Sequence, residues 1–243
     1  MSNIASRILQ SLAAVETERR RRADTPTLAG EVAALKAYQQ KRFARTHASL
    51  LAHPRYGRAA NFFLNELYGP QDFTQRDEQF SRIVPALVRL FPADTVDTVE
   101  SLAAVHALSE RLDTAMAIHL AGERPTRESY VRAWQATGET AARARQIALV
   151  MSVGEALDRH TRSFVLRTSL KAMRRPARAA GMGALQTFLE DGFDAFGAMG
   201  GAEEFLAAIQ ARETALVARL FDPTAVAAAT GPLAPDDVLD QLP

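Results

Sequence analysis

Three side chains that could ligate a metal ion lie on one line of a predicted helix. His106, Glu110 and Asp113 are spaced at i, i+4 and i+7, and residues at these spacings share a helix face. Imidazole and carboxylate ligands suit iron, manganese or zinc. The sequence contains neither the paired Glu-x-x-His repeats of di-iron bundles nor a His-Glu-x-x-His motif. The pattern therefore favours a polar network between helices, with a metal site as the alternative.

Two further carboxylates are predicted to face inward from other helices. Glu66 falls on the same side of its helix as Phe62, and Glu213 lies near the centre of the apolar face of the last long helix. A carboxylate in such a position must be paired or protonated, because burying a lone charge is costly. Arg76 and Arg143 lie on the apolar sides of their own helices. We expect one of these arginines to pair with Glu66.

Aromatic residues gather around Glu66. The segment 56–77 is the part of the chain richest in aromatic and ionisable residues, and Gly69-Pro70 ends its helix. We expect an aromatic-lined pocket near Phe62, Tyr68 and Phe73. The candidate residues for ligand binding or for a buried polar network are Glu66, Tyr68, Phe73, Arg76, Asp77, His106, Glu110, Asp113, Arg143 and Glu213.

The elements that must position these residues read as helices. Apolar residues recur at helical spacing along most of the chain, whereas the sequence has no alternating runs and no Asn-Gly turns. This predicts an all-α, single-domain bundle of about eight to nine helices over residues 1–222. Pro85 is expected to bend or split the helix over 74–91. Residues 223–243 are rich in Ala, Pro and Asp without an apolar stripe, so we expect a disordered or loosely docked acidic tail.

A run of arginines and a glycine on a buried helix face can also be interpreted from the sequence. The run of four arginines at 19–22 ends the first predicted helix, and we interpret it as a solvated helix end, where cations favour the C-terminal dipole. Gly154 lies on the buried face of its helix. A glycine there indicates either the close approach of another helix or room for a ligand.

One segment resembles a known family signature. Residues 62–68 read FFLNELY and resemble the signature of the bacterial FFLEELY-motif proteins, with Asn65 where that motif has glutamate. The likeness extends from about residue 40 to residue 213 and includes LYGPQDFTQRD, RIVPALVRLFP and LQTFLEDGF. The resemblance implies membership of an uncharacterised bacterial family and implies no activity.

Composition excludes several functional classes. The chain has 29 basic and 28 acidic residues, so no overall field attracts nucleic acid or an anionic membrane. Cysteine is absent, which excludes disulfides, thiolate metal sites and a cysteine nucleophile. The sequence has no apolar run of about 20 residues, the length that a membrane-spanning helix needs. The N-terminus lacks a secretory signal, and we expect a cytoplasmic protein.

These observations predict a binding or interaction module with an aromatic-lined pocket and a buried ion-pair network. Its partner would be a small molecule or a protein, no cofactor is predicted, and no feature indicates an oligomeric state. The alternative is a helical, non-haem, metal-dependent oxidase-like enzyme with iron or manganese on the inward carboxylates and His106. Haem binding through a histidine is a third hypothesis without a supporting motif. Nucleophilic catalysis has least support, since no serine lies in a nucleophile elbow.

Overall fold

Helices make up most of the chain. The computed structural model describes residues 3–66 and 69–243, and these residues form α-helices and one 3₁₀ helix without a strand. The all-α prediction is confirmed. The helices are Asn3–Ala23 (α1), Pro26–Thr46 (α2), Ala48–Leu51 (α3), Gly57–Glu66 (α4), Thr74–Leu90 (α5), Ala93–Leu120 (α6), Arg127–Thr137 (α7), Thr140–Thr161 (α8), Phe164–Ala179 (α9), Gly183–Met199 (α10), Glu203–Phe221 (α11), Ala225–Ala229 (α12) and the 3₁₀ helix Val238–Gln241 (η1).

The described residues form 12 α-helices, more than the eight to nine predicted. One of the additional helices, α9, follows a local signal that periodicity does not resolve. Ser163 caps α9 by accepting a hydrogen bond from the backbone N–H of Leu166, and this separates α9 from α8. In contrast, the alternative of a break at Pro85 is wrong, because α5 continues through it to Leu90.

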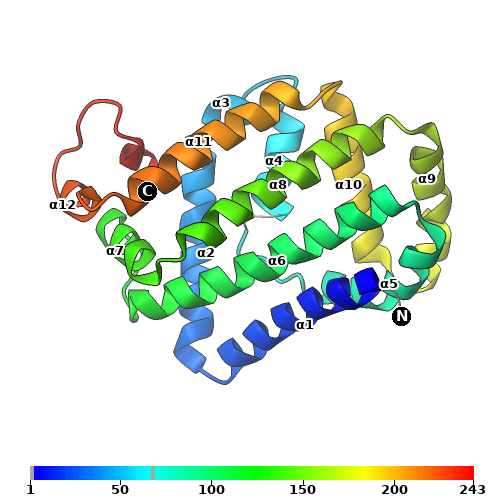
Figure 1. Ribbon diagram of the computed structural model, residues 1–243, viewed down its shortest axis with the longest axis horizontal. Coiled ribbons are helices and arrows are strands. Elements are labelled where there is room, and N and C mark those ends of the chain that lie inside the picture. The colour runs from blue at the N-terminus through cyan, green and yellow to red at the C-terminus, as the bar shows by residue number, and fades with distance from the viewer. Residues whose placement is uncertain (1–2, 67–68) are drawn as a thin grey trace.

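The long helices form two crossing layers (Figure 1). In one layer α1, α6, α8 and α11 lie side by side in that order, and α2, α4 and α10 cross behind them. Gly154 lets α8 and α11 approach closely, because a Cβ atom at this position would lie 2.5 Å from Leu206 Cδ2. The close-approach interpretation of Gly154 is therefore confirmed.

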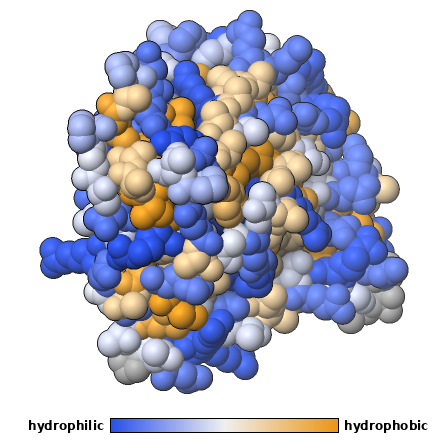
Figure 2. All heavy atoms as spheres, turned by 60° about the vertical axis from the view of Figure 1, so that its left-hand side comes forward, coloured by the Kyte–Doolittle hydropathy of each residue, from blue (hydrophilic) through white to orange (hydrophobic). Residues whose placement is uncertain are grey.

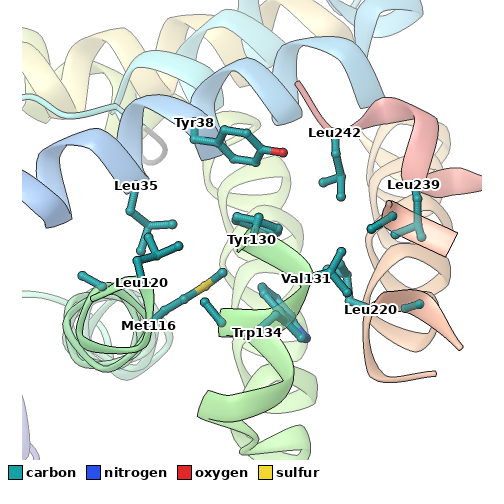
Figure 3. Close-up of a cluster of buried hydrophobic side chains, with 14 of the residues drawn as sticks. Leu35, Tyr38, Met116, Leu120, Tyr130, Val131, Trp134, Leu220, Leu239 and Leu242 are labelled. Atoms are coloured by element: carbon teal, nitrogen blue, oxygen red, sulfur yellow. The ribbon is translucent and has the colours of Figure 1, made fainter. Parts of the chain in front are cut away.

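The buried side chains that the structure describes form three hydrophobic clusters. One surrounds Tyr130 and Trp134 between α2, α6, α7 and α11 (Figure 3). The second surrounds Phe63 and Phe196 between α4, α8, α10 and α11. The third surrounds Phe80 between α1, α5 and α6. The region between the layers, where these clusters meet, positions the polar residues described below.

The C-terminal segment is part of the first cluster. Leu239 and Leu242 are fully buried against the side chains around Val131 and Leu220 (Figure 3). Asp237 accepts a hydrogen bond from Arg219 at 2.9 Å, which fixes the loop before η1. The expectation of a disordered or loosely docked tail is corrected by this packing. Its apolar residues are too irregularly spaced to form a helical stripe, so periodicity did not reveal them.

The surface is mostly hydrophilic on the face that Figure 2 turns toward the viewer. Hydrophobic residues appear there in separate groups between polar ones. Among the described residues, no helix combines the length and the apolar character that crossing a bilayer requires.

Candidate functional site

An interior cavity of about 160 Å³ lies where the three hydrophobic clusters meet. An engineered cavity of similar size, about 150 Å³, binds benzene. Tyr68 lies outside the described residues, and every other candidate residue lines this one cavity. These lining residues are Glu66, Phe73, Arg76, Asp77, His106, Glu110, Asp113, Arg143 and Glu213.

The cavity changes from apolar to polar along its length. On α6 the lining residues are apolar from Val99 to Val105 and polar from His106 to Asp113. At a rise of 1.5 Å per residue, the stretch from Val99 to Asp113 measures about 21 Å. The wall of α8 has the same division in reverse order. It begins with Arg143 and Gln146 and continues with Ile147, Val150 and Met151.

The polar ends of these two walls lie together. Gln146 of α8 donates a hydrogen bond from Nε2 to the hydroxyl of Ser109 on α6 at 2.7 Å. Arg143 stacks over Trp134, with its guanidinium carbon 3.9 Å from the ring centroid, and donates to Gln146 Oε1 at 3.2 Å. The cavity is therefore long and narrow, with one hydrophobic end and one hydrogen-bonding end.

Glu110 is held by two cations from different helices. Arg22 of α1 and Lys36 of α2 both pair with its carboxylate. Arg22 also donates to the backbone carbonyl of Glu110 at 2.7 Å. Burial raises the pKa of Glu110, but the charges of Lys36 and Arg22 outweigh it and lower the pKa to about 2. This carboxylate is therefore ionised and joins α1, α2 and α6.

Asp77 is the centre of a second polar group. It pairs with Arg19 of α1, and its Oδ2 lies 2.8 Å from His106 Nε2. Burial raises the pKa of Asp77, but the hydrogen bonds and charges of His106 and Arg19 lower it below its usual value. Because the carboxylate is ionised, the Nε2–H of His106 is the donor in this contact.

Glu213 is the centre of a third group. Arg42 of α2 pairs with its carboxylate, and His47 Nε2 lies 2.8 Å from Glu213 Oε1. Burial raises the pKa of Glu213, whereas Arg42 and His47 together lower it below its usual value. Burial also lowers the pKa of His47. A neutral His47 that donates from Nε2 to an ionised Glu213 is consistent with the lowered pKa of both groups.

Arg76 separates the cavity from a hollow on the surface. Its guanidinium carbon lies between the rings of Phe73 and Phe188, at 3.9 and 4.4 Å from their centroids. Nη1 lies 3.2 Å from Glu66 Oε2, so the predicted pairing of Glu66 with Arg76 is confirmed. Glu66 is half-buried, with 28% of its side chain exposed. All four residues line both the cavity and the surface hollow.

Asp113 differs from the other buried carboxylates. It accepts a hydrogen bond from Gln39 Nε2 at 3.1 Å. It forms no ion pair with any residue that the structure describes. Burial raises the pKa of Asp113 above its usual value, and the more distant charges of Lys36 and Arg143 only partly oppose this effect. Asp113 is thus the lining carboxyl group whose charge is least compensated.

The helical line of His106, Glu110 and Asp113 makes three separate contacts. His106 faces Asp77, Glu110 faces two cations and Asp113 faces Gln39. Within residues 3–66 and 69–243, no group of three or more His, Cys, Asp or Glu side chains is arranged to hold a metal ion. Shared position on one helix did not bring these ligands to one point, because His106 contacts α5, Glu110 contacts α1 and α2, and Asp113 contacts a different residue of α2.

Comparison with known proteins places the chain in a family. Residues 18–226 match the family described as a domain of unknown function (DUF8198). The chain belongs to this family. The DUF8198 match includes every candidate site residue and the arginines of α1 that contact them. No curated protein and no solved structure gives a significant match.

Within the DUF8198 region, sequence reasoning missed the cations of α1 and α2 that pair with Asp77, Glu110 and Glu213. The arginine run is not wholly solvated, because Arg19 and Arg22 are directed inward while Arg20 and Arg21 are exposed. The helical spacing of α1 indicates this inward direction. Arg19 and Arg22 lie four and seven positions after the buried Val15, and therefore on the same face of the helix. In α2 the stripe of buried residues continues in the same way through Gln39 and Arg42.

Proposed function

We propose that this protein binds a small, slender, amphipathic molecule in its interior cavity. The change from apolar to polar lining along both α6 and α8 supports this proposal. The polar residues of the two helices lie at the same end of the cavity, and so do their apolar residues. The apolar part of the ligand would lie beside Val99 and Val150. Its polar part would lie between Asp113 and Gln146.

The observation that carries the proposal is that Asp113 is buried in the cavity wall without an ion pair to a described residue. Burying a carboxyl group that no cation neutralises costs stability. Glu110 and Glu213 are each held by cations, so the structure has the means to neutralise a carboxylate in this region. Perturbed carboxyl groups in cavities are concentrated at functional sites. We infer that Asp113 and its neighbour Gln146 form hydrogen bonds with the polar end of the ligand.

A possible route from the surface also supports the cavity as the ligand site. The stack of Phe73, Arg76 and Phe188 is the wall common to the cavity and the surface hollow. Arg76 and Glu66 leave 13% and 28% of their side chains exposed, so this wall reaches the surface. A ligand would enter by displacing this stack rather than by opening one of the three hydrophobic clusters.

The proposal is tested by identifying what the protein carries. The chain is purified without denaturant, small molecules are released by denaturation, and they are compared by liquid chromatography and mass spectrometry with those from Ala103→Leu. Ala103 is buried and lines the cavity, so the larger side chain occupies ligand space. Ala144→Leu, the same change at an exposed position of α8, is the matched control.

We expect a small amphipathic compound in the wild-type and Ala144→Leu samples and its depletion in the Ala103→Leu sample. Equal amounts of every released compound in all three samples would contradict binding in the cavity.

A further inference from the structure

Helix α9 is the long helix least embedded in the fold. Ala177 is its only fully buried residue among the 16 that form it. Leu166 and Leu170 are half-buried and form the rest of its inner side. The helix lies along one edge of the molecule (Figure 1), where it contacts α10 and the end of α8. Most of its surface therefore faces solvent.

The exposed face of α9 is strongly basic. The helix contains five basic residues and no acidic residue, although the whole chain has nearly equal numbers of the two. On a helical wheel with about 100° per residue, these five fall within an arc of about 100°. They are Arg167, Lys171, Arg174, Arg175 and Arg178.

Most of these cations are available to a partner. Arg174 pairs with Glu190 of α10 at 2.9 Å, and Arg167 donates to a backbone carbonyl of α8. Lys171, Arg175 and Arg178 form no ion pair with any residue that the structure describes. A row of uncompensated cations complements a surface that carries many negative charges.

Large hydrophobic side chains protrude beside this basic face. Phe164 and Val165, at the start of α9, are 80% and 70% exposed. Leu90 and Phe91, where α5 leads to α6, are 69% and 41% exposed. These two turns lie at the same end of the molecule (Figure 1), since Thr98 near the start of α6 is hydrogen-bonded at 3.0 Å to His160 near the end of α8.

We propose that this end of the protein docks on the surface of a membrane that contains anionic lipids. The basic face of α9 would contact the lipid headgroups, and the four protruding side chains at the two turns would enter the boundary between headgroups and acyl chains. Interfacial binding depends on this combination of buried apolar area and attraction to anionic lipid. The proposal is independent of the ligand proposed for the cavity.

Other occupants fit the surface less well. A second copy of the chain bound through the same face would bring two basic arcs together, because a two-fold interface uses the same patch on both subunits. A nucleic acid would satisfy the cations through its phosphates. It would leave Leu90 and Val165 in water, since these aliphatic side chains cannot stack on bases as aromatic ones do.

The test is sedimentation of the full chain with lipid vesicles. One set of vesicles contains phosphatidylcholine alone, and the other contains phosphatidylcholine with phosphatidylserine. We expect the chain to sediment with the second set only, and to be released by added salt because salt screens the charges. Each cation lost near an anionic surface weakens binding about fivefold. Lys171→Glu/Arg175→Glu should therefore weaken binding at least about 25-fold.

The apolar part of the surface is tested by Phe164→Ser/Val165→Ser, which should also weaken vesicle binding. The controls are Arg145→Glu and Ile118→Ser, which make similar changes at exposed positions outside this surface and should bind as the wild type. All changed side chains are exposed, so circular dichroism should show equal helix content. Equal sedimentation with both vesicle sets, undiminished binding of the charge variant, or binding to duplex oligonucleotides without vesicle binding would each overturn the proposal.

Discussion

Asp113 lines the cavity, and its burial without an ion pair lowers the stability of the folded protein. Its pKa is raised by burial, and a group with a raised pKa favours the folded state only at low pH, where it is protonated. As pH rises above the usual pKa of an aspartate, ionisation of Asp113 therefore increasingly opposes folding. Gln39 donates to its Oδ1, an interaction that an asparagine side chain can also accept.

We therefore predict that Asp113→Asn raises the melting temperature at neutral pH. The expected gain in unfolding free energy is roughly 1 kcal/mol or more, because the cost of the buried charge is removed. Thermal unfolding measured by circular dichroism gives the result. Glu213→Gln is the matched control and should lower the melting temperature, since it leaves Arg42 buried without this carboxylate. A fall for both variants would contradict the assignment of Asp113.

The lowered pKa of Glu110 predicts how the stability of the fold depends on pH in acid. Its pKa is about 2 in the folded protein and 4.5 for the free side chain. A lowered pKa contributes stability that is present above pH 4.5 and is lost as pH falls toward about 2. The contribution is about 3 kcal/mol at neutral pH, from about 1.36 kcal/mol per pKa unit.

We predict that the urea-unfolding free energy of the wild type falls over this pH interval more steeply than that of Glu110→Gln. The variant should be less stable at neutral pH, because Arg22 and Lys36 lose their common partner. Identical slopes for the two proteins would show that Glu110 is not the titrating group.

At the scale of elements, the sequence indicated which faces point inward but not which helices meet. The pairing of Glu66 with Arg76 could be predicted because only ten positions separate them. Arg42 and Glu213 are 171 positions apart, and no local pattern relates α2 to α11. Helical periodicity specifies a face, whereas the choice of partner depends on how the two layers cross.

The same reasoning explains the candidate site. The inward positions of Glu66 and Glu213 could be predicted from their place on apolar faces, and the structure brings both to one cavity. The metal-like spacing of His106, Glu110 and Asp113 was less informative, because neighbouring α1, α2 and α5 supply a separate partner to each. Whether these residues bind a ligand stays a prediction.

The C-terminal segment gives a prediction for a whole element. A chain that ends at Asp222 loses the fully buried side chains of Leu239 and Leu242 and the contact between Arg219 and Asp237. Burial of one leucine side chain contributes about 1.5–3 kcal/mol. We predict a loss of at least about 3 kcal/mol in unfolding free energy, measured by urea denaturation. Leu239→Ala should reproduce part of this loss, and a truncated chain as stable as the full one would contradict the docking of the segment.

At the scale of the whole molecule, the cavity results from how two helical layers are joined. Hydrophobic clusters meet between the layers, and cations from α1 and α2 hold the carboxylates of α6 and α11. Paired charges of this kind rigidify a site only when each member is satisfied. In the proposed function, the uncompensated Asp113 is the group that a ligand would contact.

Calorimetric titration with indole tests the central claim most directly. Indole combines an aromatic ring that suits the apolar lining with one N–H group that can donate to Asp113 or Gln146. Its six-membered ring is that of benzene, which a cavity of about 150 Å³ binds. The account predicts saturable binding of one indole to the wild type and to Ala144→Leu, and at least tenfold weaker binding to Ala103→Leu, about 1.4 kcal/mol. Absence of saturable binding to the wild type, or equal affinity in Ala103→Leu, would contradict a ligand-binding cavity.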